Sequence, residues 1–248
     1  AYPRTDADGL ERALDALVRA VEEAVRDGAN IIALSNRAGE GKVPIPSLLA
    51  VGAVHNHLMN VGLRTFADLI VDAGDAMSAH DVSALLAYSA SGIFPSTAHR
   101  AIEELASNAR LTGKDGDALT AAEGIANYNR ALVAGMVSIM SKMGISTAQS
   151  YHSAQIFEAV GLAPVFVDRY FTGTVSRVGG LDVRDIEREL NERFDAACAW
   201  QHSPAPSELP SLGLTKWRPQ GGEEHLIDPQ AIYLLQRSVR TDSFDDFL

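Results

Sequence analysis

The sequence of 248 residues contains a single cysteine, Cys198, and few basic side chains. One cysteine cannot form an internal disulfide framework, and it cannot supply the several thiolates that hold an iron–sulfur cluster. Lysine and arginine together number 21 against 32 aspartate and glutamate residues, which leaves a formal charge of −11. Because contact with phosphates requires clustered basic side chains, this balance argues against nucleic acid and against an anionic membrane surface as partners.

Long hydrophobic runs are missing as well. No apolar segment approaches the roughly 20 residues that cross a bilayer. The sequence does not open with a basic stretch followed by an apolar core, so we expect no signal peptide. We therefore expect the cytoplasm as the compartment. The composition, 46% hydrophobic and 21% charged, is typical of a globular protein with one large domain or two smaller ones.

The first half alternates predicted helices with short predicted strands. Apolar residues three and four apart predict a helix over residues 9–26, which Gly28 ends. Further helices are predicted over 47–61 and from the N-cap Ser78 to Leu86, and strands over 31–34, 66–71 and 88–95. This order predicts an α/β fold with (β/α) barrel-like units, in which parallel strands are joined by crossover helices as in part of a TIM barrel.

The polar segment 114–117 is the clearest break in the middle of the chain. We predict a domain boundary there, which separates residues 1–117 from residues 118–248. Helices are predicted over 120–136, over 185–200 with Glu187 on the exposed side, and over 228–240 with Asp228 as the N-cap. The segment 203–213 is predicted to be a surface loop, and the acidic tail 242–248 to be loosely structured.

Several polar patterns have an ordinary structural explanation beside a functional one. Residues 39–42 resemble a fragment of a phosphate loop, but Val43 follows the lysine where serine or threonine is needed, which favours a flexible loop. His55 and His57 point to different sides of the predicted helix, which favours packing roles over a shared metal. For the pair at 80–81, a capping role is favoured over a polarised histidine.

Two segments support a functional prediction. The apolar run before Ser141 is interpreted as a buried strand that ends in a turn with Lys142 and Gly144. A desolvated lysine there would bind an anion or stabilise a reduced flavin, and an exposed loop lysine is the alternative. The segment 171–180 places threonine, serine and three glycines around Arg177. It is interpreted as a mobile loop that clamps an anion, with a plain glycine-rich connection as the alternative.

These motifs together resemble the large subunit of glutamate synthase from one end of the chain to the other. The resemblance rests on twelve short segments and two single residues: 33–37, 43–50, 53–58, 62–64, 127–128, 140–146, 154–159, 171–174, 176–177, 217–218, 222–223 and 235–236, with His225 and Pro229. It implies that residues 1–117 are the C-terminal part of the family's central domain. Residues 118–248 would then open the family's FMN-binding synthase barrel.

The resemblance also implies an activity. The family enzyme is an oxidoreductase that transfers the amide nitrogen of glutamine to 2-oxoglutarate and yields glutamate. FMN is the implied cofactor, and the residues implied beside its isoalloxazine are Met140, Ser141, Lys142, Met143 and Gly144. No catalytic residue and no metal ligand are implied in this chain, and the family's iron–sulfur cluster is not expected to bind it. The implied partners are the remaining domains of the enzyme, with 2-oxoglutarate and ammonia.

At several positions the family usually has a different residue, and most of these replacements remove charge or polarity. The positions are Asn36, Asn56, Asp81, Ser138, His152 and Gln230. They motivate a second hypothesis, in which the chain is a catalytically inactive, free-standing scaffold or interaction module derived from that enzyme. Stoichiometric FMN in the purified protein would contradict this alternative.

Overall fold

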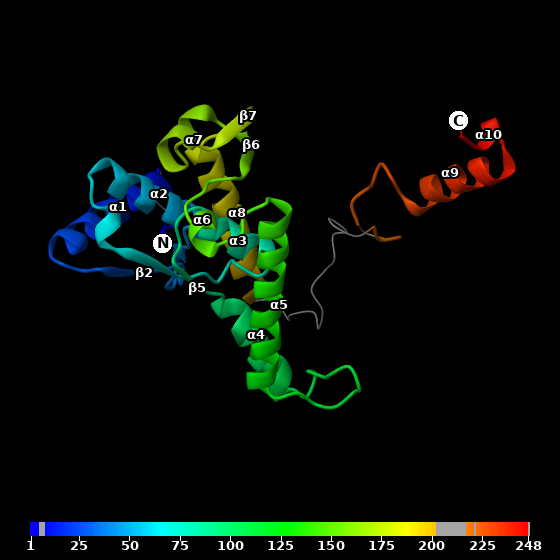
Figure 1. Ribbon diagram of the computed structural model, residues 1–248, viewed down its shortest axis with the longest axis horizontal. Helices are drawn as coiled ribbons and strands as arrows, with labels where there is room; N and C mark the ends of the chain where they lie inside the picture. Colours follow the sequence, from blue (N-terminus) through cyan, green and yellow to red (C-terminus); the bar gives the residue numbers. More distant parts are fainter. Residues whose placement is uncertain (5–7, 202–216, 221, 248) are drawn as a thin grey trace. The chain divides into compact units, whose positions relative to one another are not determined.

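The computed structural model describes residues 1–4, 8–201, 217–220 and 222–247 (Figure 1). The chain divides into two compact units, Ala1–Ala196 and Ala197–Leu248. The predicted loop 203–213 lies outside the described residues. Within the described ranges, no helix is long and apolar enough to cross a membrane.

A three-stranded parallel sheet lies in the first unit (Figure 1). Its strands are β2 (Ile31–Ser35), β4 (Asp68–Asp72) and β5 (Gly92–Phe94), in the order β2-β4-β5. Helix α2 (Ser47–Asn60) connects the first two strands, and helix α3 (Ala79–Ala87) connects the second and third. The predicted α/β class, with parallel strands and crossover helices in a partial, barrel-like arrangement, is confirmed.

The sheet buries only one of its two faces. Side chains alternate along β2 and β4, so that Ile32, Leu34, Leu69 and Val71 are buried while Ile31 and Ile70 are exposed. This period of two is what a strand with one covered face requires. Helix α2 packs against β2 and β4, and helix α1 (Gly9–Arg26) packs against α2. The core therefore lies between the sheet and these two helices.

Helix α1 begins and ends where the sequence predicts. Its buried face consists of Leu10, Leu14, Val21 and Val25. Gly28 follows the helix with a φ of +99°, a left-handed conformation that glycine adopts at little cost. At the start of the chain, β1 (Tyr2–Pro3) pairs antiparallel with β3 (Lys42–Val43), so the predicted loop 39–42 leads directly into a short strand.

Helix α5 (Ala121–Lys142) is longer than predicted. It packs against α3 and against α4 (Ser96–Ser107), and a capping box between Thr120 and Glu123 begins it. The predicted end at residue 136 is wrong, because Gly135 does not terminate the helix. A Cβ at Gly135 would lie 2.4 Å from the Cβ of Ala79, so this glycine allows α3 and α5 to approach closely.

The rest of the first unit contains a second parallel sheet, which consists of the two strands β6 (Glu158–Leu162) and β7 (Val175–Leu181). Helix α7 (Pro164–Tyr170) connects them and packs on α2. The short helices η1 (Arg64–Phe66) and α6 (Ala148–Tyr151) lie in the connections before β4 and β6. Helix α8 (Val183–Gln201) follows β7 and agrees with the predicted helix 185–200.

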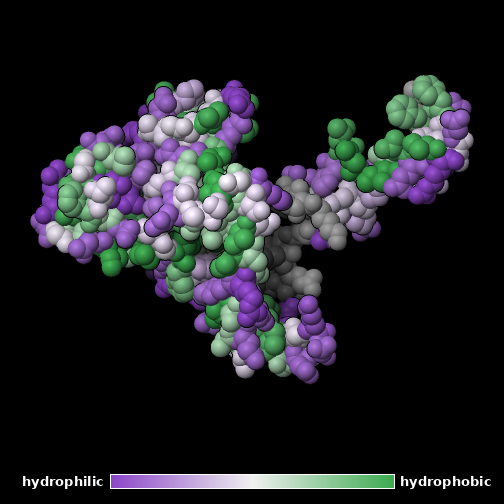
Figure 2. Space-filling model, viewed as in Figure 1, coloured by the Kyte–Doolittle hydropathy of each residue, from purple (hydrophilic) through white to green (hydrophobic). Residues whose placement is uncertain are grey.

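In the second unit, the described residues from 229 onward form α9 (Pro229–Thr241) and α10 (Phe244–Phe247). Asp228 caps α9 as predicted, since its carboxylate accepts a hydrogen bond of 2.7 Å from the Ala231 N–H. The prediction of a loose tail is wrong for residues 244–247, because an ion pair between Arg237 and Asp246 ties α10 to α9. Figure 2 shows hydrophobic side chains along this unit, and Leu226, Ile227, Val239 and Phe244 are exposed.

Candidate functional site

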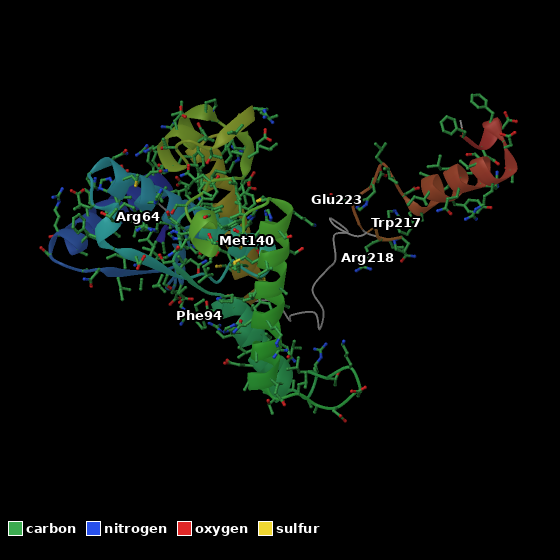
Figure 3. All side chains as sticks on the ribbon, in the orientation of Figure 1. Arg64, Phe94, Met140, Trp217, Arg218 and Glu223 are labelled. Carbon is green, nitrogen blue, oxygen red and sulfur yellow. The ribbon has the colours of Figure 1, made fainter. Side chains whose placement is uncertain are left out.

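The five residues predicted beside a flavin lie at the end of a helix, not at the end of a strand. Met140, Ser141 and Lys142 form the last turn of α5, and Met143 and Gly144 follow it. The strand interpretation is wrong because burial repeats every three to four residues here. Leu132, Met136 and Met140 all lie on the covered side of the helix. Figure 3 labels Met140 on this helix.

The end of α5 presents polar groups to solvent. Met140 is buried, whereas Ser141, Lys142, Met143 and Gly144 are exposed. Gly144 has a φ of +73°, and the Ile145 N–H reaches back to the Met140 carbonyl at 3.0 Å, which closes the helix in the manner of a glycine C-cap. Lys142 therefore places its ammonium beside the negative end of a helix dipole, where a cation is favourable.

The segment 171–180 is not the mobile loop that the sequence suggested. Only residues 171–174 lie outside regular secondary structure, and residues from Val175 onward form β7 beside β6. Arg177 lies on this strand and pairs with Glu158 at 3.3 Å. Gly180 is needed for packing, because a Cβ at this position would lie 2.4 Å from the Gly161 carbonyl oxygen. This glycine allows close strand contact, so glycine content alone misled the prediction.

Polar side chains meet at the carboxyl ends of β2 and β4. The Ser35 hydroxyl donates to Asp72 at 3.1 Å, and Arg37 pairs with the same carboxylate at 2.7 Å. The Asn36 side-chain oxygen accepts from the Gly74 N–H at 2.9 Å. The sequence did not lead us to predict a role for Asp72. Its position directly after a predicted strand was the available signal, because carboxyl ends of parallel strands are common sites of function.

A cavity of about 360 Å³ opens beside these strand ends. Ser35, Asn36 and Ser47 line it together with apolar residues of α1 and α2. The Ser47 hydroxyl is buried and has no hydrogen-bond partner among the described residues, while its backbone N–H donates to Asp75 at 2.8 Å. The lining residues include no histidine, cysteine or lysine. The cavity is therefore equipped to hold a small polar group, and it has no acid–base pair of its own.

The two histidines of α2 have separate partners, as the sequence predicts. His57 contacts Glu22 of α1 at 2.6 Å, whereas the His55 ring accepts a 3.1 Å hydrogen bond from Arg64. Asp81 caps α3 by accepting from the Ser78 N–H, which confirms the favoured role of the pair at 80–81. Within the described part of the chain, no cluster of three or more potential ligands is arranged to hold a metal ion.

Lowering the pH from 7 to 5 is expected to reduce the free energy of unfolding by about 2 kcal/mol through His55. Burial, which is the largest cause, and the charges of Arg64 and His152 together lower the pKa of this histidine from 6.5 to about 4. A lowered pKa stabilises the neutral ring, so the contribution is complete above pH 6.5 and is lost as the pH falls toward 4. Denaturant titrations at pH 7, 6 and 5 measure this loss. The variant His55→Gln should show a flatter dependence, and an unchanged slope would contradict the assignment.

Parallel strands, crossover helices and polar side chains at the strand ends together define a barrel-like protein of the α/β class. The sequence matches the family described as the glutamate synthase central domain over residues 1–163, and the chain belongs to that family. The matched range includes the whole of α5 and the turn with Lys142. It also extends past residue 117, and the domain boundary near that residue stays a prediction.

Three relatives illustrate the similarity. The chain is 37% identical to the large chain of NADPH glutamate synthase from Bacillus subtilis, an alignment that covers 97% of this chain and 15% of the relative. It is 39% identical to ferredoxin-dependent glutamate synthase 2 of Synechocystis, with coverages of 96% and 16%. It is 34% identical to NADH glutamate synthase of Saccharomyces cerevisiae, with coverages of 94% and 11%. The chain thus spans only 16% or less of the length of these relatives.

Proposed function

We propose that this chain is a segment of a glutamate synthase-like oxidoreductase, which transfers the amide nitrogen of glutamine reductively to 2-oxoglutarate and yields glutamate. The observation that supports the proposal is family membership together with an accessible turn at residues 141–144. The remaining domains of the enzyme would supply the amidotransferase, the phosphate site of the flavin and the iron–sulfur ligands. 2-Oxoglutarate and ammonia would be the small-molecule partners.

The residues at the end of α5 fit a flavin in part. Ser141, Lys142 and Met143 are exposed, and a Cβ placed on Gly144 would meet nothing within 4 Å, so a planar ring can approach this turn. Met140 is only 7% exposed and packs in the core. We therefore assign Met140 to positioning the turn and the other four residues to contact with FMN.

Lys142 would provide the electrostatic part of the site. A fixed positive charge beside the isoalloxazine favours the reduced, anionic form of the ring. The flavin, when bound, supplies the hydride that reduces the substrate. The chain's own contribution is to hold the ammonium at a defined place, which the rigid end of a 22-residue helix can do.

Replacing Lys142 with alanine in the complete enzyme is expected to slow flavin reduction or turnover by about tenfold or more, because one preorganised charge is removed from the reacting ring. Stopped-flow measurement of the flavin absorbance gives the reduction rate separately from turnover. Lys114→Ala is the matched control, since Lys114 is exposed in the turn that follows Gly113. Wild-type rates in Lys142→Ala would exclude the proposed role, and a complete protein purified without FMN would favour the scaffold hypothesis.

A further inference from the structure

A second, open pocket of about 610 Å³ lies away from the strand ends. The end of α2, the turn that follows it and the segment between α6 and β6 form its walls. Nine of its ten lining residues carry polar side chains and none of them is acidic, although the chain has a formal charge of −11. Its volume is within the range of small-molecule sites. Because no carboxylate lines this pocket, a negatively charged ligand would fit it best.

Arg64 supplies the positive charge of the pocket (Figure 3). Its guanidinium donates to the His55 ring at 3.1 Å, to the Ser89 carbonyl at 3.0 Å and to the Ala67 carbonyl. All three acceptors are neutral groups, and they use three of the five N–H donors of a guanidinium. Burial lowers the pKa of Arg64, and Asp68 opposes this effect from a distance. The guanidinium is thus fixed in position, and two of its N–H donors remain for a ligand. No carboxylate among the described residues is bonded to it.

The segment between α6 and β6, which also lines the pocket, is held in an unusual backbone conformation. Ser153 and Gln155 both have left-handed φ values, of 63° and 49°, which are unfavourable for side chains other than glycine. Their backbone N–H groups donate to the carbonyls of Leu86 and Ala87 at 3.2 and 3.0 Å, which fixes the segment. The Ser153 hydroxyl bonds to His152 Nδ1 at 3.2 Å. The Nε2 atom of the same ring is buried and has no partner within the described ranges. The fixed segment places the polar side chains of Ser153 and Gln155 in the lining of the pocket.

We propose that this pocket binds a compact anion through its carboxylate or phosphate oxygens. Arg64 would provide the positive charge. The side-chain amides of Asn56 and Asn60 would donate hydrogen bonds from α2, and the Gln155 amide would donate from the segment between α6 and β6. The inference does not depend on the flavin proposal, because none of these residues belongs to the turn at 141–144.

Titration calorimetry on the complete protein tests the proposal, with inorganic phosphate in one series and malonate in another at constant ionic strength. Asn60→Asp places a negative charge at the rim without removing a hydrogen bond that the structure shows. It is expected to weaken binding by about tenfold or more. Asn108→Asp makes the same isosteric change on an exposed residue outside the pocket and should leave binding unchanged. Arg64→Gln removes the positive charge and should abolish binding. If that variant fails to fold, the affinity of Asn60→Asp still tests the proposal.

Binding of phosphate alone would assign a phosphorylated ligand, and binding of malonate alone would assign a carboxylate. Other anion sites in the complete protein contribute equally to wild type and to both asparagine variants, so only the difference between the variants is used. Equal affinities in Asn60→Asp and Asn108→Asp would overturn the proposal. So would the lack of saturable binding of either anion up to about 10 mM, which corresponds to an affinity at least tenfold weaker than a millimolar site.

Discussion

Replacing Glu187 with alanine is expected to lower the free energy of unfolding by about 3 kcal/mol, because a buried carboxylate caps a distant helix. Glu187 lies on α8, is 7% exposed, and accepts hydrogen bonds from the N–H groups of Gly9 at 3.1 Å and Leu10 at 3.3 Å. These donors open α1, and Asp8, which precedes them, makes no side-chain cap. Removal of the carboxylate would leave two buried N–H groups unpaired at the positive end of the helix dipole.

Denaturant unfolding followed by circular dichroism measures this loss. Glu187→Gln keeps one acceptor oxygen but replaces the other with an NH2 group, which cannot accept from the second N–H, so an intermediate loss of about 2 kcal/mol is expected. Glu189→Ala is the matched control, since Glu189 is only partly buried on the same helix and its contact with Arg193 is long, at 3.9 Å. That control should stay within about 0.5 kcal/mol of wild type. Similar losses in Glu187→Ala and Glu189→Ala would refute the capping role.

Glu187 also shows where prediction from sequence stops. The helix itself was predicted correctly, because three- and four-residue spacing is a local signal. The same spacing placed Glu187 on the exposed side, which is wrong, since its partners lie 177 and 178 residues earlier in the chain. Local caps behaved differently. The roles of Ser78 and Asp228 were predicted, because each bonds to a residue three positions away.

The candidate site divides in the same way. The motif at residues 140–144 was recognised from the sequence, and its turn at Gly144 was placed correctly. The strand before it was wrong, because a short apolar run fits a buried strand and one side of a helix equally well. The polar pocket around Arg64 was not predicted. Its walls come from residues near 60 and near 155, and only folding brings them together.

Replacing Gly52 with alanine is expected to lower the free energy of unfolding by about 2 kcal/mol, although alanine favours a helix over glycine by about 1 kcal/mol. Gly52 lies in the middle of α2, where α7 packs against it. A Cβ at this position would lie 2.5 Å from the Tyr170 carbonyl oxygen and 2.8 Å from the Phe171 ring. The carbonyl belongs to the backbone, so α7 itself would have to move.

Gly124→Ala in α5 is the matched control for Gly52→Ala in the same denaturant titration. A Cβ at Gly124 would also meet close neighbours, Leu111 Cδ2 at 2.6 Å and Ile102 Cγ2 at 2.7 Å, but both atoms belong to side chains and not to the backbone. These side chains can rotate away, so the gain in helix propensity should offset most of the cost and leave a change below about 1 kcal/mol. If both variants lose the same stability, close contact with the α7 backbone does not explain the requirement for glycine at position 52. A loss confined to Gly52→Ala would show that α2 and the backbone of α7 can keep their close contact only with glycine at position 52.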